Sequence, residues 1–331
     1  MASADQLKAL LESHTEGDDS RFFAVAMQVA AAEARKGHTK LSQELRALID
    51  KARANPTIKA AKTPTPIASP RGGLADLLSV SYPKVRLSDM TLDSRILARL
   101  KRVLKEQRYF DKLRSYGLSP RRKLLLTGPP GCGKTMTASA LAGELGVPLF
   151  VVRLDGLITK YMGESISKLR LIFDAMEQTR AVYLFDEFDS IGTHRGFVND
   201  VGEIKRVLNS FLMFIEQDAS TGLVMAATNH PQSLDYALFR RFDELIEYEL
   251  PTADLIEETL KNKLCLYERV KVNFRKVAAA AQGFSYAEIT QACEEAVKDA
   301  VLNDRKVITT NDVLAPLSER SHYHERYTQK E

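Results

Sequence analysis

Short apolar runs alternate with helix-length amphipathic segments from about Leu74 to residue 250. Most of these runs are largely apolar, which is typical of strands covered by helices on both faces. The alternation predicts an α/β fold at residues 80–250, with a parallel sheet and helices on both of its faces. The runs are KLLLTG (123–128), PLFVVRL (148–154), AVYLFD (181–186), GLVMAATN (222–229) and ELIEYEL (244–250).

The pattern becomes helical after Pro251. Apolar residues recur there at the spacing of an amphipathic helix, and no further strand pattern follows. We therefore predict a small helical lid subdomain at residues 251–320 and a polar tail at 321–331. The predicted helical segments are 252–267, 274–281, 286–303 and 309–317.

The N-terminal part of the chain has a third pattern. Residues 1–54 contain three short helical stripes, each with one apolar face that must be buried against the others or against a partner. No residue in this segment is poised for chemistry. We expect a helical bundle that binds a substrate or a partner, or one that only supports oligomerisation. Residues 55–79 are rich in proline, which predicts an extended linker.

Composition places the chain among ordinary globular proteins. Hydrophobic residues make up 44% and charged residues 27% of the sequence, and no apolar run is long enough to cross a membrane. The polar opening of the chain is unlike a secretory signal, so we expect a cytoplasmic protein. Three widely spaced cysteines predict neither a disulfide framework nor a zinc site. A net charge of +4, with only short basic clusters, favours solvated faces over nucleic-acid contact.

The segment GPPGCGKT lies between the first apolar run and a helical segment. Its glycines allow backbone N–H groups to surround phosphate oxygens at the start of a helix. Lys134 can reach the β- and γ-phosphates of a nucleotide, and Thr135 can bind Mg²⁺. The motif therefore predicts a P-loop NTPase fold that binds ATP and Mg²⁺. The expected nucleotide contacts are Pro130, Gly131, Cys132, Gly133, Lys134, Thr135 and Met136, with Cys132 a small filler rather than a nucleophile.

An acidic pair, Asp186 and Glu187, ends the run AVYLFD. Asp186 can hold Mg²⁺ through water, and Glu187 can polarise the water that attacks the γ-phosphate. The pair follows the phosphate loop by about fifty residues and so predicts hydrolysis, the alternative being an acidic strand end without a catalytic role. Asp189 has a weaker claim and would cap the next helix.

Four segments together resemble the AAA ATPases of the AAA+ superfamily. The similarity extends over roughly residues 80–317 and implies one ATPase module of the kind that remodels or unfolds proteins. The segments are GPPGCGKT, LFDEFD, MAATNHPQSLDYALFRRFDE and GFSYAEITQACEEAV.

The resemblance implies further contacts to the nucleotide. Asn229 would be the polar sensor that helps to position the attacking water, the alternative being a strand-end turn former. Asp89, Met90 and Ala287 would lie on the adenine side. Tyr286 stands where the family usually has glycine, which is a departure in this part of the site.

The resemblance also implies residues that act beyond their own subunit's site. Tyr161 and Met162 would project into the central pore of a ring and grip an extended polypeptide. Arg240 and Arg241 would reach the γ-phosphate held by the adjacent subunit, although related proteins separate the two arginines by two residues. The alternative for the arginines is a set of surface ion pairs with the acidic pair at 243–244.

Together these features predict an ATP-hydrolysing ring, a hexameric homo-oligomer, that remodels, unfolds or threads protein substrates through its pore. Protein substrates or a partner enzyme would be recruited by residues 1–54. Two alternatives remain open: a nucleotide-dependent switch that controls a partner enzyme such as a protease, and a DNA-directed AAA+ loader or regulator. A switch would need no pore aromatic, and a loader would need a DNA-binding module that the sequence does not indicate.

Overall fold

The computed structural model describes residues 72–157, 164–189, 200–265, 267 and 269–328, and six isolated positions nearer the N-terminus. Almost all of them belong to the second of two compact units, residues 66–331. The predicted bundle at residues 1–54 lies outside the described residues apart from the six positions. These six are helical and fall in the second and third predicted stripes: Ala26, Met27, Val29, Glu44, Leu45 and Ala47.

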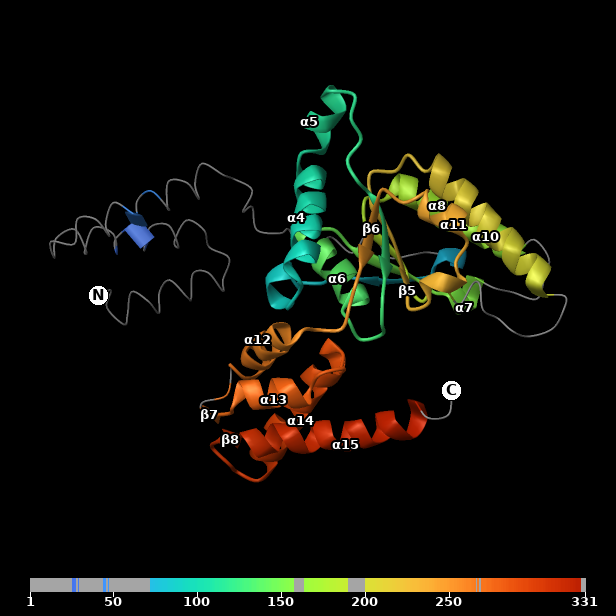
Figure 1. The fold of residues 1–331 in the computed structure, drawn as a ribbon. Coiled ribbons are helices and arrows are strands. Elements are labelled where there is room, and N and C mark those ends of the chain that lie inside the picture. The colour runs from blue at the N-terminus through green and yellow to red at the C-terminus, as the bar shows by residue number, and fades with distance from the viewer. Residues whose placement is uncertain are drawn as a thin grey trace. The chain divides into compact units, whose positions relative to one another are not determined.

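A six-stranded, mostly parallel sheet forms the centre of the described unit (Figure 1). The strand order is β1-β3-β4-β5-β2-β6, in which β1 runs antiparallel to β3 and all other neighbours are parallel. The five parallel strands coincide with the five predicted apolar runs, so the predicted α/β fold is confirmed. The bounds are β1 Leu78–Ser81, β2 Lys123–Thr127, β3 Leu149–Val152, β4 Val182–Phe185, β5 Leu223–Thr228 and β6 Glu244–Glu247.

Helices cover both faces of the sheet because the strands bury side chains on both faces. In β4, Val182 and Leu184 belong to one apolar core, and Tyr183 and Phe185 belong to the other. Helices α4 and α6 pack on the first face, and α8 and α10 pack on the second (Figure 1). Their bounds are α4 Ser94–Arg108, α6 Lys134–Leu145, α8 Glu164–Gln178 and α10 Asp200–Gln217.

Strand β1 corrects the N-terminal boundary of the folded module. The predicted linker at 55–79 overlaps this strand, whose neighbour Leu77 and first residue Leu78 are buried in the core. The extended linker therefore ends earlier than predicted. Shorter elements complete this part of the unit: η2 Gly72–Leu74, η3 Leu87–Asp89, α5 Phe110–Ser115, α7 Leu154–Leu157, η4 Pro231–Ser233 and α11 Tyr236–Phe239.

The C-terminal part of the unit is helical, with a separate apolar core of its own. Two parallel two-residue strands join its loops, which corrects the expectation that no strand follows Pro251. The last helix also continues through most of the segment predicted as a polar tail. The bounds are α12 Ala253–Leu264, β7 Val270–Lys271, α13 Phe274–Ala280, α14 Tyr286–Leu302, β8 Ile308–Thr309 and α15 Thr310–Thr328.

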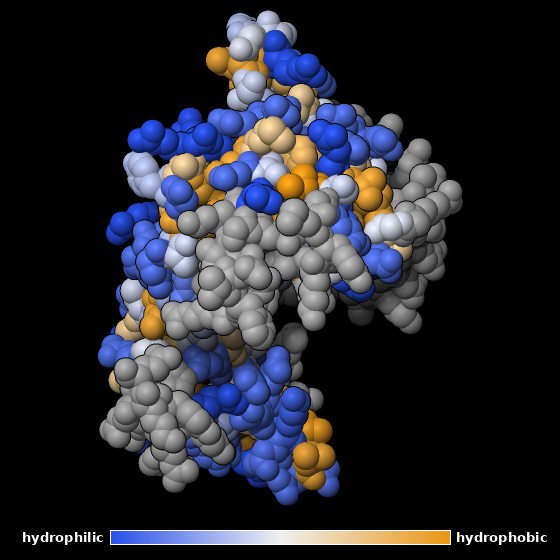
Figure 2. All heavy atoms as spheres, turned by 90° about the vertical axis from the view of Figure 1, so that its right-hand side faces the viewer, coloured by the Kyte–Doolittle hydropathy of each residue, from blue (hydrophilic) through white to orange (hydrophobic). Residues whose placement is uncertain are grey.

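The surface is consistent with this division of the apolar residues into buried cores. Among the residues that Figure 2 colours on one side of the molecule, most are hydrophilic, and the apolar residues form separate groups between them. None of the described helices combines the length and the hydrophobicity that a membrane span requires.

Candidate active site

The loop between β2 and α6 has a backbone that requires glycine at three positions. Gly128, Gly131 and Gly133 have φ angles of +131°, +73° and +95°, which residues with a Cβ rarely adopt. At Gly128 a Cβ would also lie 2.1 Å from the carbonyl oxygen of Tyr248, the residue after β6. Glycine at these three positions therefore lets the loop take this shape without strain and bring its backbone N–H groups toward a ligand.

Lys134, the first residue of α6, lies inside this loop. Its ammonium donates hydrogen bonds to the carbonyl oxygens of Gly128 and Pro129, both at 2.7 Å. The side chain is buried, and burial lowers the pKa of its amine, while Cys132 and Asp186 act in the opposite direction. The amine is thus held at the centre of the loop, where a phosphate oxygen can replace the two carbonyl groups as its acceptor.

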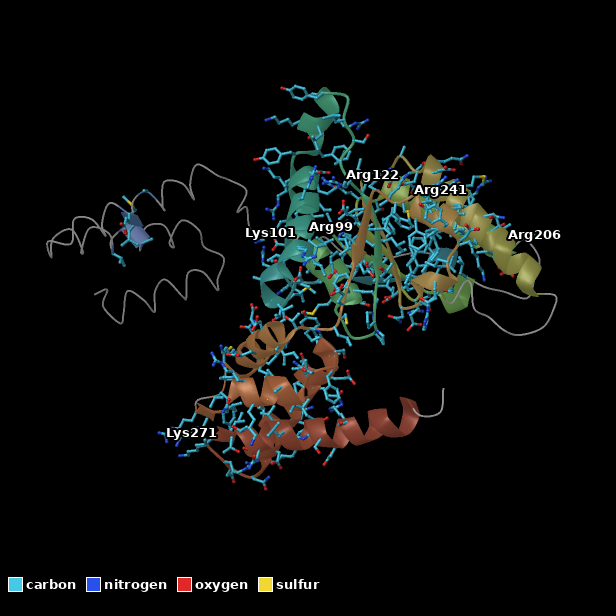
Figure 3. The ribbon with its side chains drawn as sticks, viewed as in Figure 1. Arg99, Lys101, Arg122, Arg206, Arg241 and Lys271 are labelled. Atoms are coloured by element: carbon cyan, nitrogen blue, oxygen red, sulfur yellow. The ribbon has the colours of Figure 1, made fainter. Side chains whose placement is uncertain are left out.

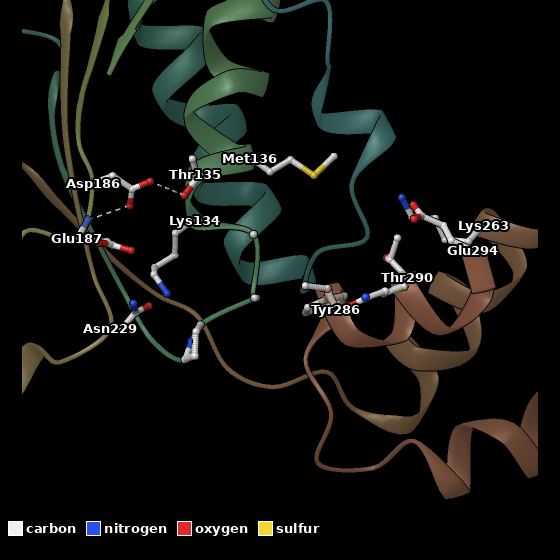
Figure 4. A pocket seen from close by; sticks show the side chains of 15 residues that line it. Lys134, Thr135, Met136, Asp186, Glu187, Asn229, Lys263, Tyr286, Thr290 and Glu294 are labelled. Carbon is white, nitrogen blue, oxygen red and sulfur yellow. Dashed lines mark hydrogen bonds between the residues drawn. The ribbon is translucent and has the colours of Figure 1, made fainter. Parts of the chain in front are cut away.

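The acidic pair faces the start of α6. The Thr135 hydroxyl donates to one Asp186 oxygen at 2.7 Å, and the other Asp186 oxygen accepts the backbone N–H of Glu187 at 3.0 Å (Figure 4). Glu187 has a φ angle of +47°, in the left-handed region that costs a residue with a Cβ about 1–2 kcal/mol. This turn of the backbone separates the two carboxylates: Asp186 faces the threonine, and Glu187 is exposed in the pocket.

Asn229 follows the neighbouring strand β5 and reaches the same pocket. Its backbone N–H donates to Asp189 at 3.2 Å, and the same carboxylate oxygen accepts the Thr228 hydroxyl at 2.8 Å. Asp189 therefore ties the end of β4 to the end of β5. From the sequence we expected Asp189 to cap the next helix. Its partners Thr228 and Asn229 lie 39 and 40 residues away, and the sequence gives no signal for such a distant contact.

The C-terminal helical part of the unit, predicted to be a lid, forms the other wall of the pocket, whose cavity volume is about 550 Å³. The backbone N–H of Ala287, near the start of α14, donates to the carbonyl oxygen of Gly131 at 3.1 Å. Tyr286 lines the pocket beside it. Sequence reasoning missed four further lining residues, three of which share the helix face of Ala287 because they follow it by three, four and seven positions. They are Thr290, Gln291 and Glu294 on α14, and Lys263 on α12 (Figure 4).

Comparisons with known proteins agree with this arrangement. The sequence model of the "ATPase family associated with various cellular activities (AAA)" matches residues 124–250. The chain is 36% identical over 323 residues to an uncharacterized AAA family ATPase, y4kL, of Sinorhizobium fredii, covering 97% of this chain and 96% of that protein. This chain belongs to the AAA family of ATPases.

A second group of relatives is longer than this AAA ATPase. The ATP-dependent zinc metalloprotease FtsH of Acidobacterium capsulatum is 33% identical over 248 residues, which are 72% of this chain but only 38% of that protein. FtsH of Acidothermus cellulolyticus is 31% identical over 250 residues, 37% of its length. The shared part is an ATPase module, so this chain binds a nucleotide and hydrolyses ATP. Family membership also suggests oligomeric assembly.

Most of the predicted nucleotide contacts of this AAA ATPase line one pocket. They are Pro130, Gly131, Gly133, Lys134, Thr135, Met136, Asp186, Glu187, Asn229 and Ala287. The side chain of Cys132 does not line it: this residue is buried in the core, and burial raises the pKa of its thiol. Asp89 does not line it either; its carboxylate accepts the backbone N–H of Arg86 at 2.9 Å. Met90 lies against the loop, 3.2 Å from where a Cβ on Gly133 would be. The predicted pore residues Tyr161 and Met162 lie outside the described residues.

The two adjacent arginines have different surroundings. Arg241 is partly buried: its Nε lies 3.2 Å from a carboxylate oxygen of Glu216 on α10, and its guanidinium donates to the carbonyl oxygen of Ala237 at 2.8 Å (Figure 3). Arg240 is exposed, and its guanidinium carbon lies 5.0 Å from the ring centre of Tyr236, which is itself exposed. Neither arginine lines the pocket of its own chain.

The alternative of ion pairs with residues 243–244 is wrong. Asp243 accepts hydrogen bonds from the backbone N–H groups of Arg122 and Lys123, both at 2.9 Å. Glu244 pairs with Arg99 of α4 (Figure 3 labels this arginine). Both carboxylates therefore tie β6 to neighbouring elements, and the exposed guanidinium of Arg240 has an aromatic ring as its neighbour instead.

Proposed function

We propose that this AAA ATPase hydrolyses Mg²⁺-ATP in the pocket between the phosphate loop and the lid. Lys134 would hold the β- and γ-phosphates, with the loop N–H groups around the remaining oxygens. Glu187 would accept a proton from the attacking water, and Asn229 would help to orient that water. The supporting observation is that side chains from the ends of three parallel strands meet in one pocket, as ligand sites do in open α/β sheets.

The Thr135 hydroxyl and the Asp186 carboxylate fit a Mg²⁺ site. They are hard oxygen groups 2.7 Å apart beside the expected phosphate position, and Mg²⁺ commonly takes one or two such ligands together with waters and phosphates. We propose that Thr135 binds the ion directly and Asp186 through water. When bound, the ion would neutralise charge that develops on the phosphates. No larger cluster of metal-binding side chains occurs in the described part of the chain.

The site is best explained as one shared between subunits. Among the described residues that line the pocket, the only cationic side chains are those of Lys134 and Lys263, and Lys263 lies on the lid. An arginine that stabilises the charged transition state would therefore come from another copy of the chain. Arg240 is the better candidate because it is exposed, whereas Arg241 is anchored to α10. Head-to-tail contacts of this kind close into rings, and we propose a hexamer.

We further propose that the ring remodels protein substrates, with residues 1–54 as a recruiting bundle, 55 to about 71 as a tether and 251–320 as a lid. The FtsH relatives, named as ATP-dependent zinc metalloproteases, support a protein substrate, although this chain spans less than two fifths of the first of them. Their protease activity does not transfer to this chain, because the comparison covers only 38% of that protein. A switch that controls a separate protease is the second candidate, since the same relatives couple an ATPase to a protease.

A Tyr161→Ala variant tests threading. Its basal ATPase rate should stay close to that of the unaltered protein, while unfolding of a tagged, folded test protein should be lost, because Tyr161 is predicted to contact the polypeptide and not the phosphates. Tyr116→Ala is a matched control: Tyr116 is 75% exposed at the end of α5, and its removal should affect neither activity. Unfolding at the original rate by Tyr161→Ala would refute threading and favour the switch.

A further inference from the structure

The pocket lining combines polar groups that suit phosphates with two large side chains, Met136 and Tyr286, that offer apolar surface. Polar and charged side chains from the phosphate loop, the start of α6 and the strand ends, among them Lys134 and Glu187, form the part that suits phosphates (Figure 4). Met136 from α6 and Tyr286 from α14 contribute apolar surface to the lining, beside the polar lid residues Lys263, Thr290, Gln291 and Glu294. Met136 is a large apolar side chain that remains 37% exposed. An apolar surface next to a phosphate site suits a flat heterocyclic base attached to the phosphates.

Tyr286 is fixed in place by its neighbours. It is the first residue of α14, directly after Ser285, whose hydroxyl caps the helix. The next residue, Ala287, is hydrogen-bonded to the carbonyl oxygen of Gly131 at 3.1 Å. The Tyr286 ring is half-buried and packs against the core cluster that also contacts Met90. A lid residue is thereby held at the apex of the phosphate loop.

The hydroxyl of Tyr286 takes no part in the packing of the ring. It forms no hydrogen bond with another residue in the part of the chain that the structure describes. Burial, followed by the nearby Cys132, Asp93 and Glu258, raises the pKa of this phenol to about 12, so the ring is neutral at ordinary pH. A neutral aromatic ring on a pocket wall offers a face on which a base can stack, and such stacking contributes about 1–3 kcal/mol per base.

We propose that Tyr286 stacks on the base of the bound nucleoside triphosphate, with Met136 on the same apolar surface, and thereby supplies base affinity from the lid. This inference rests on the proposed function of the pocket. Related proteins usually have glycine at this position, and glycine has no ring that could stack on a base. Every base has a π-face, so stacking should distinguish a nucleotide from a polyphosphate that has no base. It should distinguish one purine from another much less.

Binding measurements on the full chain with two probes test the proposal. Tyr286→Ala should weaken ATP binding about 5- to 150-fold, the range that corresponds to loss of one stacked base, and should leave tripolyphosphate binding unchanged. Tyr286→Phe keeps the ring and should bind ATP like the unaltered protein. Equal weakening for ATP and tripolyphosphate, or an unchanged ATP affinity in Tyr286→Ala, would overturn the proposal. If the unaltered protein binds neither probe, the proposed function of the pocket fails instead.

A spectroscopic variant gives a second readout, because the chain contains no tryptophan. In Tyr286→Trp the new indole is the sole tryptophan, and ATP should change its fluorescence while tripolyphosphate should not. Tyr116→Trp, at an exposed position on α5, is the control and should respond to neither. Equal responses of Tyr286→Trp to both ligands would assign the residue to lid movement and contradict stacking.

Discussion

Replacing Glu187 by glutamine separates nucleotide binding from hydrolysis. The Glu187 side chain lines the pocket but forms no hydrogen bond or ion pair with another described residue. Glutamine has the same length and branching, so the left-handed backbone at this position, with φ +47°, carries the same cost in both proteins. The change therefore removes one proton acceptor and little else, and the free energy of unfolding should stay within about 0.5 kcal/mol.

The expected effect on rate follows from the loss of a general base. Such a group contributes about 10²- to 10⁴-fold, which corresponds to about 2.7–5.4 kcal/mol of transition-state stabilisation. Binding should be spared, because the hydrogen bonds of Lys134 and of the pair Thr135 and Asp186 do not involve the Glu187 side chain.

Steady-state phosphate release at saturating ATP would measure the rate, and equilibrium dialysis with labelled ATP would measure the Kd. Glu249→Gln, an exposed residue of the segment after β6, is the matched control and should leave both values unchanged. The reasoning is refuted if Glu187→Gln weakens ATP binding as much as it slows hydrolysis, or if it retains more than about a tenth of the original rate.

Three further perturbations have distinct expected outcomes. Gly146 has a φ of +66° and open space around the position of a Cβ, so Gly146→Ala should lower the free energy of unfolding, measured in urea, by about 1–2 kcal/mol. Gly128→Ala should lower it by more, because its Cβ would collide with the backbone at Tyr248. Equal losses in the two variants would contradict this reasoning. Asp189→Asn should lower kcat by about tenfold with little change in KM, since a neutral acceptor holds Asn229 less firmly; an unchanged kcat would count against it. Deletion of residues 1–54 should preserve ATP hydrolysis and abolish capture of native partners, and full capture by the shortened chain would exclude a recruiting role.

The sheet could be predicted from the sequence because its buried strands are marked by continuous apolar runs. β1 was missed because its four residues, LSVS, carry little of that signal and its partner β3 lies about seventy residues away. The strands β7 and β8 are only two residues long and depend on the fold of the loops around them.

The positions of site residues could be predicted where a sequence motif determines the backbone conformation. They could not be predicted where the direction of a side chain depends on the surrounding fold. Glycines at fixed spacing identified the loop, but nothing in the sequence says that Cys132 faces the core. The difference between Arg240 and Arg241 was also hidden, since it depends on Glu216, which is distant in sequence. The lid wall carried a usable signal in the helical spacing from Ala287. The roles of the pore and sensor residues remain predictions.

The central claim, an active site completed by an arginine of the adjacent subunit, is tested most directly by mixing two inactive variants. Lys134→Ala keeps the arginine but loses the amine of the phosphate loop. Arg240→Ala keeps the phosphate loop intact but loses the arginine. With random equal mixing in a closed ring, about one interface in four joins an intact loop to an intact arginine, so ATPase activity should recover towards about a quarter once subunit exchange is verified. No recovery in exchanged rings, with either Arg240→Ala or Arg241→Ala as the second variant, would contradict the shared site.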